Sequence, residues 1–367
     1  MTQRLALTPQ ECYSRGVMES MGLDKRKAYI LATVVYEYIA TAEPVGSQVL
    51  TQKYNLGISS ATVRNEMAEL EAAGYLVQPH TSAGRIPSDA GYRTYVDRLM
   101  QPEELTGDDR RRIRDELSDA TRELDEIIDH TTRLLGRLSN NLAFVTKPQQ
   151  ETQSFKHIQL IWLSPHTGVA IVVTSLGVAA QSLFELGAEV QPDDLTRFSN
   201  ALNARLANRR LNEVTESEIS AAAREVGVSE DLRGAVVTAC LSARSNEQPT
   251  IAAAGAQNLL DQPEFQDLRK LRSILRIVEE QKTLYQLVAD AMSADTASVK
   301  IGRELGSEEL ADLSIVTVPY HFGSHAFGML SILGPRRMPY ARLVALASGT
   351  AESLSQRLSD VDHLPSS

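Results

Sequence analysis

The chain has 367 residues, of which 43% are hydrophobic and 23% are charged, and its formal net charge is −10. This composition excludes a disordered protein, and the length predicts about two or three domains. The acidic balance excludes nucleic-acid binding through overall charge, because phosphates are neutralised by Lys and Arg, but one local face would suffice.

The chain begins with a segment that carries no strong pattern, residues 1–23, which we expect to be an irregular extension. It has no apolar run long enough for a signal peptide. Two cysteines, Cys12 and Cys240, are too few for a disulfide framework and indicate a reduced, cytoplasmic setting. The longest apolar stretch, 158–180, is interrupted by polar residues, so no membrane partner is expected.

The first strong pattern is a helical stripe of apolar residues over 25–40. A short helix is predicted over 47–54, and a third helix begins with a serine cap and closes at a glycine, over 59–74. A short strand at 75–78, a loop and a further helix follow. Three helices, a strand and a loop in this order predict a winged helix-turn-helix domain over 24–102.

The third helix has two distinct faces. Val63, Met67 and Leu70 form one narrow apolar stripe that should face the domain core. On the other side, Asn65 can pair with adenine and Arg64 can reach guanine or phosphate in a major groove. The alternative is an ordinary amphipathic helix with an alanine-rich solvent face.

The loop after the strand, 78–88, is polar and contains no acid, so it can lie against phosphates or enter a minor groove. Acidic and basic residues are equally numerous over 24–100, so tight binding should depend on dimerisation and base contacts. The predicted DNA contacts are the polar or small residues at the helix start and in the loop: Ser59, Ser60, Ala61, Thr62, Arg64, Asn65, His80, Thr81, Ser82 and Arg85.

A charged linker and helix follow over 103–148. Apolar residues recur there in alternating steps of four and three, which is a heptad seam: Ile113, Leu117, Ala120, Leu124, Ile127, Thr131, Leu134 and Leu138. The seam fits a partner helix from a second copy of the chain, and it fits equally well a long helix lying on its own domain.

Strands flank a helical block in the rest of the chain. The pattern predicts an antiparallel meander between 158 and 185, helices over 192–245, later strands between 298 and 333, and a last helix over 340–358. We therefore expect an α+β multidomain protein. One α+β domain, formed by 149–189 and 286–358, is interrupted by a helical insert at 190–285, and a polar tail occupies 359–367.

No arrangement of residues typical of an enzyme is present, and no catalytic residue, cofactor or metal is predicted. The chain lacks a P-loop and a G-x-S-x-G elbow. His321 and His325 could be metal ligands, but ordinary loop histidines are the better interpretation because no cysteine is near. Trp162 lies in an apolar strand and is expected in the core.

Three motifs identify a family. SSATVRNEMAELE at 59–71, QPHTSAGRIP at 78–87 and GYRTYVD at 91–97 closely resemble the HrcA family of heat-inducible transcriptional repressors. The likeness covers about 24–358 and includes three later motifs, NLLDQPEF at 258–265, VKIG at 299–302 and LGPRRM at 333–338. The extension at 1–23 and Pro339 depart from the family pattern.

The resemblance implies a winged helix, a GAF-like domain and an inserted dimerising domain. It also implies a homodimer that represses heat-shock chaperone operons by binding double-stranded DNA at an inverted-repeat operator. The family depends on a GroE-type chaperonin, and heat, which diverts the chaperonin to unfolded proteins, releases the operon.

Two other functions stay open at this stage. A GAF-like domain can bind a small molecule, so a metabolite-responsive repressor is the second hypothesis. The third is an interaction protein whose winged helix binds another protein. Whether the insert or the 103–141 helix forms the dimer is also open.

Overall fold

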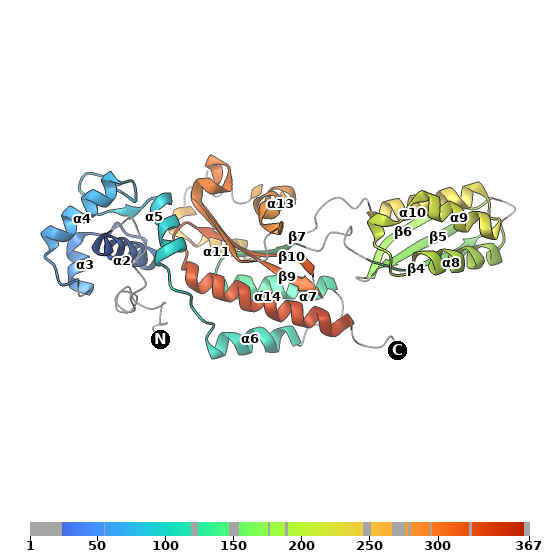
Figure 1. Cartoon of the computed structure of the whole chain (residues 1–367), viewed down its shortest axis with the longest axis horizontal. Coiled ribbons are helices and arrows are strands. Elements are labelled where there is room, and N and C mark those ends of the chain that lie inside the picture. The colour runs from blue at the N-terminus through green and yellow to red at the C-terminus, as the bar shows by residue number, and fades with distance from the viewer. Residues whose placement is uncertain are drawn as a thin grey trace. The chain divides into compact units, whose positions relative to one another are not determined.

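The computed structural model describes residues 24–54, 56–118, 124–146, 154–174, 177–187, 190–244, 251–265, 276–277, 280–293, 296–322 and 325–362 (Figure 1). The chain divides into two compact units. Unit 1 comprises Met1–Thr146 and Ile251–Ser367, and unit 2 comprises Lys147–Thr250. The predicted extension at 1–23 lies outside the described residues, and the last helix continues four residues into the predicted tail.

Unit 1 begins with a helical segment that ends in a small hairpin and a further helix. In order, its elements are α2 (Lys25–Thr41), α3 (Ser47–Lys53), α4 (Ser60–Ala72), β1 (Leu76–Val77), β2 (Ile86–Pro87), α5 (Asp89–Thr94) and the π-helix η1 (Tyr95–Leu99). β1 and β2 pair antiparallel. This is the order of elements that the sequence predicted, and their assignment as a winged helix stays a prediction.

Serine caps set where two of these helices begin. The Ser59 hydroxyl accepts a hydrogen bond from the Thr62 amide at 3.1 Å, and the Ser88 hydroxyl accepts one from the Gly91 amide at 3.1 Å. Each cap satisfies an amide of the first turn that has no partner within its helix. The starts of α4 and α5 are therefore fixed by local sequence.

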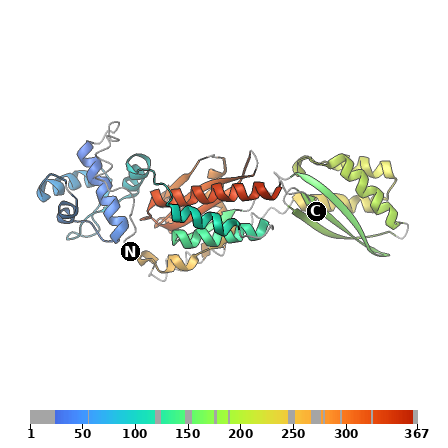
Figure 2. The same ribbon diagram turned by 90° about the horizontal axis from the view of Figure 1, so that it is seen from below.

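The rest of unit 1 is a five-stranded antiparallel sheet with helices on both faces. The strand order is β7 (Ile251–Ala254), β3 (Leu142–Thr146), β10 (His325–Pro335), β9 (Leu313–Phe322) and β8 (Ser298–Ile301). α7 (Leu124–Ser139) and α14 (Tyr340–Asp362) share a buried cluster with one face, and Figure 2 shows α14, in red, on this side of the sheet. α11 (Ala256–Leu260) and α13 (Gln281–Ala289) share a cluster with the other face. The GAF-like assignment of this domain stays a prediction.

Short 3-10 helices connect the larger elements. They are η3 (Leu211–Glu213) in unit 2 and, in unit 1, η4 (Pro263–Phe265), η5 (Asp290–Ser293), η6 (Gly302–Leu305) and η7 (Glu308–Leu310).

Unit 2 corrects the predicted position of the insert. β4 (Phe155–Ser164), β5 (Thr167–Thr174) and β6 (Gly177–Glu185) form a separate three-stranded antiparallel sheet, in the predicted meander order. Their apolar face packs on α8 (Pro192–Leu206), α9 (Glu216–Val226) and α10 (Glu230–Arg244). The insert therefore spans 147–250 and contains a sheet, so 149–189 do not join 286–358 as expected.

Side chains of the predicted heptad seam pack against each other within the chain. α6 (Gly107–Ser118) places Ile113 and Leu117 in one buried cluster with Leu134 of α7. Residues 119–123, between the two helices, lie outside the described residues. Since these side chains are already buried, the seam packs on its own domain, as in the second interpretation. It does so as two helices that pack on each other, so the expectation of one long helix is wrong.

One hydrophobic core runs through both parts of unit 1. Ile30 and Met67 of the helical segment belong to the same buried cluster as Tyr92 of α5, Tyr340 of α14 and Val316 of β9. The N-terminal segment is therefore packed directly on the sheet domain.

Candidate nucleic-acid interface

α4 turns its predicted apolar stripe into the core. Val63 and Leu70 are 0% exposed and Met67 is 1% exposed. A repeat of three to four residues places these side chains on one face of a helix, where they meet α2. The predicted inward orientation is confirmed.

The outer face of α4 carries small residues around two polar ones. Ala61, Arg64, Asn65 and Ala68 are all exposed. Within the described part of the chain, Arg64 forms no hydrogen bond or ion pair, so its guanidinium is available to an external anion or base. An amide and a guanidinium beside short alanines fit the close approach of a base-pair edge.

The three acids of α4 are neutralised by cations from neighbouring elements. Lys27 of α2 lies 2.9 Å from Glu69 and 3.7 Å from Glu66, and Arg26 lies 3.6 Å from Glu66. Glu71 pairs with Arg85. The hydrogen bond to Glu69 raises the pKa of Lys27, so this cation stays charged at neutral pH. The equal numbers of acids and bases over 24–100 therefore conceal an uneven distribution, in which the acids of α4 are paired and Arg64 has no partner among the described residues.

The hydroxyls at the start of α4 already have partners. The Ser59 hydroxyl lies 2.9 Å from that of Thr62, and the Ser60 hydroxyl lies 3.0 Å from that of Ser47 at the start of α3. Ser59 remains exposed. The contact between Ser47 and Ser60 fixes the start of α4 relative to the start of α3.

The loop between β1 and β2 presents a polar tip. The Gln78 side-chain amide donates to the carbonyls of Thr81 and Ala83, at 3.1 and 3.0 Å, and holds the turn closed. His80, Thr81 and Ser82 are exposed at this tip. The predicted loop contacts are therefore at the surface.

Arg85 lies differently from the expectation. Its Nε donates a 2.9 Å hydrogen bond to Glu71, and its side chain is only 16% exposed. Its backbone exchanges two 2.9 Å hydrogen bonds with Val45, at a point where a Cβ on Gly84 would lie 2.5 Å from the Val45 carbonyl. Arg85 therefore ties the loop to α4 and to the α2–α3 turn, and its guanidinium is bound to Glu71 in this structure.

Comparison with known proteins gives the family. Residues 125–344, more than half of the chain, match the model described as the HrcA protein C-terminal domain. The chain belongs to the HrcA family. HrcA relatives also match outside that region. The heat-inducible transcription repressor HrcA of Pelotomaculum thermopropionicum is 38% identical over 341 residues, which cover 92% of this chain and 97% of that protein.

A second relative and a solved structure are also similar to this chain. The heat-inducible transcription repressor HrcA of Moorella thermoacetica is 37% identical over 92% of this chain and 98% of that protein. A crystal structure of a hypothetical protein is similar with a TM-score of 0.59 and 23% identity, over 92% of this chain and 99% of that one. The structural likeness shows the mixed α and β fold, and the HrcA relatives show a family of transcription repressors.

The described residues show neither a metal-binding cluster nor a membrane-spanning helix. Among the described ranges, no cluster of three or more His, Cys, Asp or Glu side chains is arranged to hold a metal ion. His321 and His325 lie at the ends of β9 and β10, next to the undescribed residues 323–324. No helix in the described ranges of this HrcA chain combines the length and apolarity that a membrane span requires.

Proposed function

We propose that this chain is a transcriptional repressor that reads an operator with the outer face of α4 and the tip of the β1–β2 loop. The observation that carries the proposal is the distribution of charge on α4. Its acids are paired with cations of α2 and the loop, while Arg64 and Asn65 are exposed and Arg64 has no partner among the described residues. A helix arranged in this way can enter a major groove without repelling the phosphates.

We propose heat-shock chaperone operons as the target, in the cytoplasm, with an inverted repeat as the operator. The names of the relatives, heat-inducible transcription repressors, support this choice. The test is a mobility shift of the full chain on an inverted-repeat fragment from a chaperone promoter, with a scrambled fragment of the same length as the control. Equal affinity for the two fragments would refute sequence-specific repression.

The repressor acts as a homodimer in this proposal, and unit 2 supplies the interface. The face of the β4–β5–β6 sheet opposite the helices carries Ile161, Val169, Ile171 and Leu183, by the alternation of side chains along paired strands. Leu183 is 69% exposed and Leu163, at the end of β4, is 57% exposed. Large exposed apolar groups clustered on one face are typical of a protein interface. In a symmetric dimer, this face of one copy would be buried against the same face of the other.

A GroE-type chaperonin is the proposed partner that keeps the repressor active. Family membership supports this, and heat would then release the operon by diverting the chaperonin. The same mobility shift with and without added chaperonin tests the point. We expect the active fraction of repressor to rise when chaperonin and ATP are present, and an unchanged active fraction after mild heating would contradict the proposal.

A further inference from the structure

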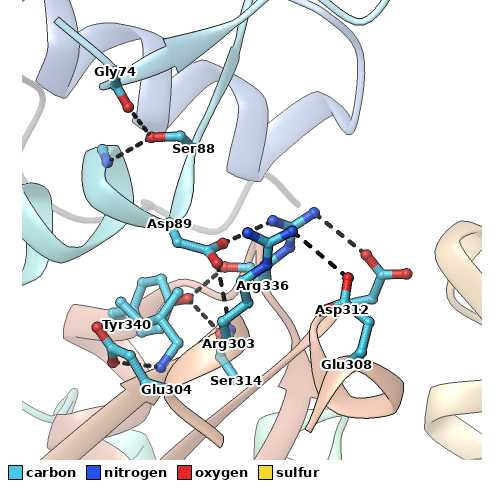
Figure 3. A network of polar contacts seen from close by, with 12 residues as sticks. Gly74, Ser88, Asp89, Arg303, Glu304, Glu308, Asp312, Ser314, Arg336 and Tyr340 are labelled. Carbon is cyan, nitrogen blue, oxygen red and sulfur yellow. Dashed lines mark hydrogen bonds and ion pairs between the residues drawn. The ribbon is translucent and has the colours of Figure 1, made fainter. Parts of the chain in front are cut away.

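The helix that follows the β1–β2 loop is firmly joined to α4. The Ser88 hydroxyl donates a 2.6 Å hydrogen bond to the carbonyl of Gly74, just after α4 (Figure 3). The Ser88 amide donates to the Tyr75 carbonyl at 3.0 Å. A Cβ on Gly91 would lie 2.2 Å from the carbonyl oxygen of Tyr75, the residue before β1, so α5 approaches this backbone as closely as glycine allows. Any contact that fixes α5 therefore also fixes α4.

Asp89, the first residue of α5, binds the sheet domain with both carboxylate oxygens. Oδ1 accepts a 2.8 Å hydrogen bond from Arg336, in the turn after β10, and Oδ2 accepts one from the backbone amide of Arg303 at 3.3 Å. The other arm of the Arg336 guanidinium donates to Asp312 at 3.3 Å. Figure 3 shows Asp89 and Asp312 on opposite sides of this arginine. A planar guanidinium held at two points has a defined orientation.

The sheet domain is shaped to receive this carboxylate. Gly302, at the start of η6, has a φ of 55°, and a Cβ there would lie 2.7 Å from Asp89 Oδ1. Both the backbone conformation and the contact favour glycine over any other residue at this position. The close approach of Asp89 is thus built into the backbone of the β8–η6 turn.

A second charged residue of α5 makes the complementary contact. Arg93 Nε donates a 2.9 Å hydrogen bond to Glu304, and one terminal nitrogen donates to the Val299 carbonyl at 2.6 Å. Glu304 is itself held by the backbone amide of Ile301 at 2.9 Å. Between the two charged residues, Tyr92 packs edge-to-face on Tyr340 with ring centroids 6.1 Å apart.

We propose that this contact positions the DNA-reading helices for the operator, and we name it the α5 clamp: Asp89, Arg93, Gly302, Glu304 and Arg336. On α5, the acid Asp89 meets Arg336 and the base Arg93 meets Glu304. If α5 were shifted or reversed on the sheet domain, like charges would be brought together. Partly exposed ion pairs add little stability, but paired charges specify a unique geometry. The clamp residues are positioning residues, because none of them lies on the exposed face of α4.

The consequence concerns the spacing of half-sites in the operator. A dimer that binds an inverted repeat recognises a fixed separation of the half-sites only if the DNA-reading helices of each protomer are held in a fixed orientation to the rest of that protomer. Apart from packing, the chain connects η1 to α6 only through residues 100–106, which have no regular secondary structure. The shared apolar core holds the two parts together without directional contacts, whereas the clamp fixes an orientation. The clamp is therefore expected to set the tolerance of half-site spacing, while Arg64 and Asn65 determine base preference. This inference rests on the proposed function.

The test compares Arg336→Ala with Arg303→Ala. Both variants remove one positive charge from the same domain. Among the described residues, however, the Arg303 side chain pairs only with Glu308, and the Arg303 backbone amide, which binds Asp89, is retained. Binding is measured on a single half-site, on the full inverted repeat, and on repeats whose spacer is lengthened or shortened. We expect Arg336→Ala to keep half-site affinity, to lose about tenfold or more on the full repeat, and to discriminate less among spacers. Arg303→Ala should behave as the wild type.

A distance measurement without DNA tests the α5 clamp independently of the proposed function. Spin labels are placed through Ser82→Cys and Glu352→Cys in a Cys12→Ser background, with labelled chains diluted into unlabelled ones. We expect a narrow distance distribution in the parent protein and in Arg303→Ala, and a broad one with Arg336→Ala. A narrow distribution and unchanged spacer discrimination in Arg336→Ala would overturn the inference. Broadening in a protein that binds no inverted repeat would support the clamp and refute the proposed repressor.

Discussion

The hydroxyl of Tyr54 donates a 2.8 Å hydrogen bond to the carboxylate of Glu37, and both side chains are buried where α3 ends against α2. Lys53 forms an ion pair with the same carboxylate. Burial and the hydrogen bond to Glu37 raise the pKa of Tyr54 above its ordinary value, so the hydroxyl stays protonated and donates throughout the physiological range. The helices α2 and α3 are therefore joined by a buried carboxylate that has two donors, Tyr54 and Lys53.

Removing one of these donors should destabilise the N-terminal segment. Tyr54→Phe leaves one oxygen of a buried carboxylate without its partner, which should lower the free energy of unfolding by about 1–3 kcal/mol. Chemical denaturation measures the loss. Tyr38→Phe is the control, because the Tyr38 hydroxyl makes no hydrogen bond among the described residues and its removal should be nearly neutral. Equal losses in the two variants would mean that the Glu37 contact contributes nothing specific.

The residues that should read bases are Arg64 and Asn65. Arg64→Ala or Asn65→Ala should weaken operator binding by about 1–3 kcal/mol and relax the preference at one base pair, because each removes a contact with a base edge. Competition binding against operators with single substitutions measures both effects. Arg98→Ala removes the same charge from an exposed position on η1 and should keep base preference intact. If base preference in Asn65→Ala equals that of the wild type, α4 does not present Asn65 to a base.

Local sequence was sufficient to predict α4 and its orientation. The periodic spacing of Val63, Met67 and Leu70 and the serine cap are encoded within about fifteen residues, and both appear in the structure as expected. The pairing of Lys27 with Glu69 could not be predicted in the same way. It depends on the angle at which α2 crosses α4, and a count of charges contains no such information.

Strand pairing set the other limit of prediction. The apolar strands at 142–146 and 155–164 are close in sequence, yet β3 pairs with β7 and β10, whereas β4 pairs with β5. Hairpin turns made the β4–β5–β6 meander predictable, because its pairings are local. The pairing of β3 with β10 joins residues nearly 190 positions apart, and no local pattern distinguishes it from a continuation of the meander. The predicted insert boundary was misplaced for this reason.

The face of the β4–β5–β6 sheet opposite the helices should determine the oligomeric state of the protein. Leu183→Asp places a charge among the apolar side chains of this face and should convert the dimer to a monomer, because burying an unpaired carboxylate in an interface is costly. Light scattering during size exclusion measures the mass. Leu241→Asp, at a residue of α10 that is 47% exposed, is the matched control and should remain dimeric. A Leu183→Asp dimer would locate the interface elsewhere, with the surface of α6 as the next region to test.

For Arg85, the sequence and the structure predict different roles in DNA binding. A phosphate ligand releases counterions, so its loss lowers the slope of log affinity against log salt by about 0.9. An arginine that holds the loop against Glu71 changes affinity without changing that slope. From the 2.9 Å contact with Glu71 and the low exposure of the side chain, we expect Arg85→Ala to weaken binding at every salt concentration with the slope retained. Glu71→Gln should produce a smaller loss of the same kind, because it weakens the pair from the other side and leaves the arginine in place. A reduced slope in Arg85→Ala, together with an increased slope in Glu71→Gln, would mean that the guanidinium leaves Glu71 and reaches a phosphate when DNA binds.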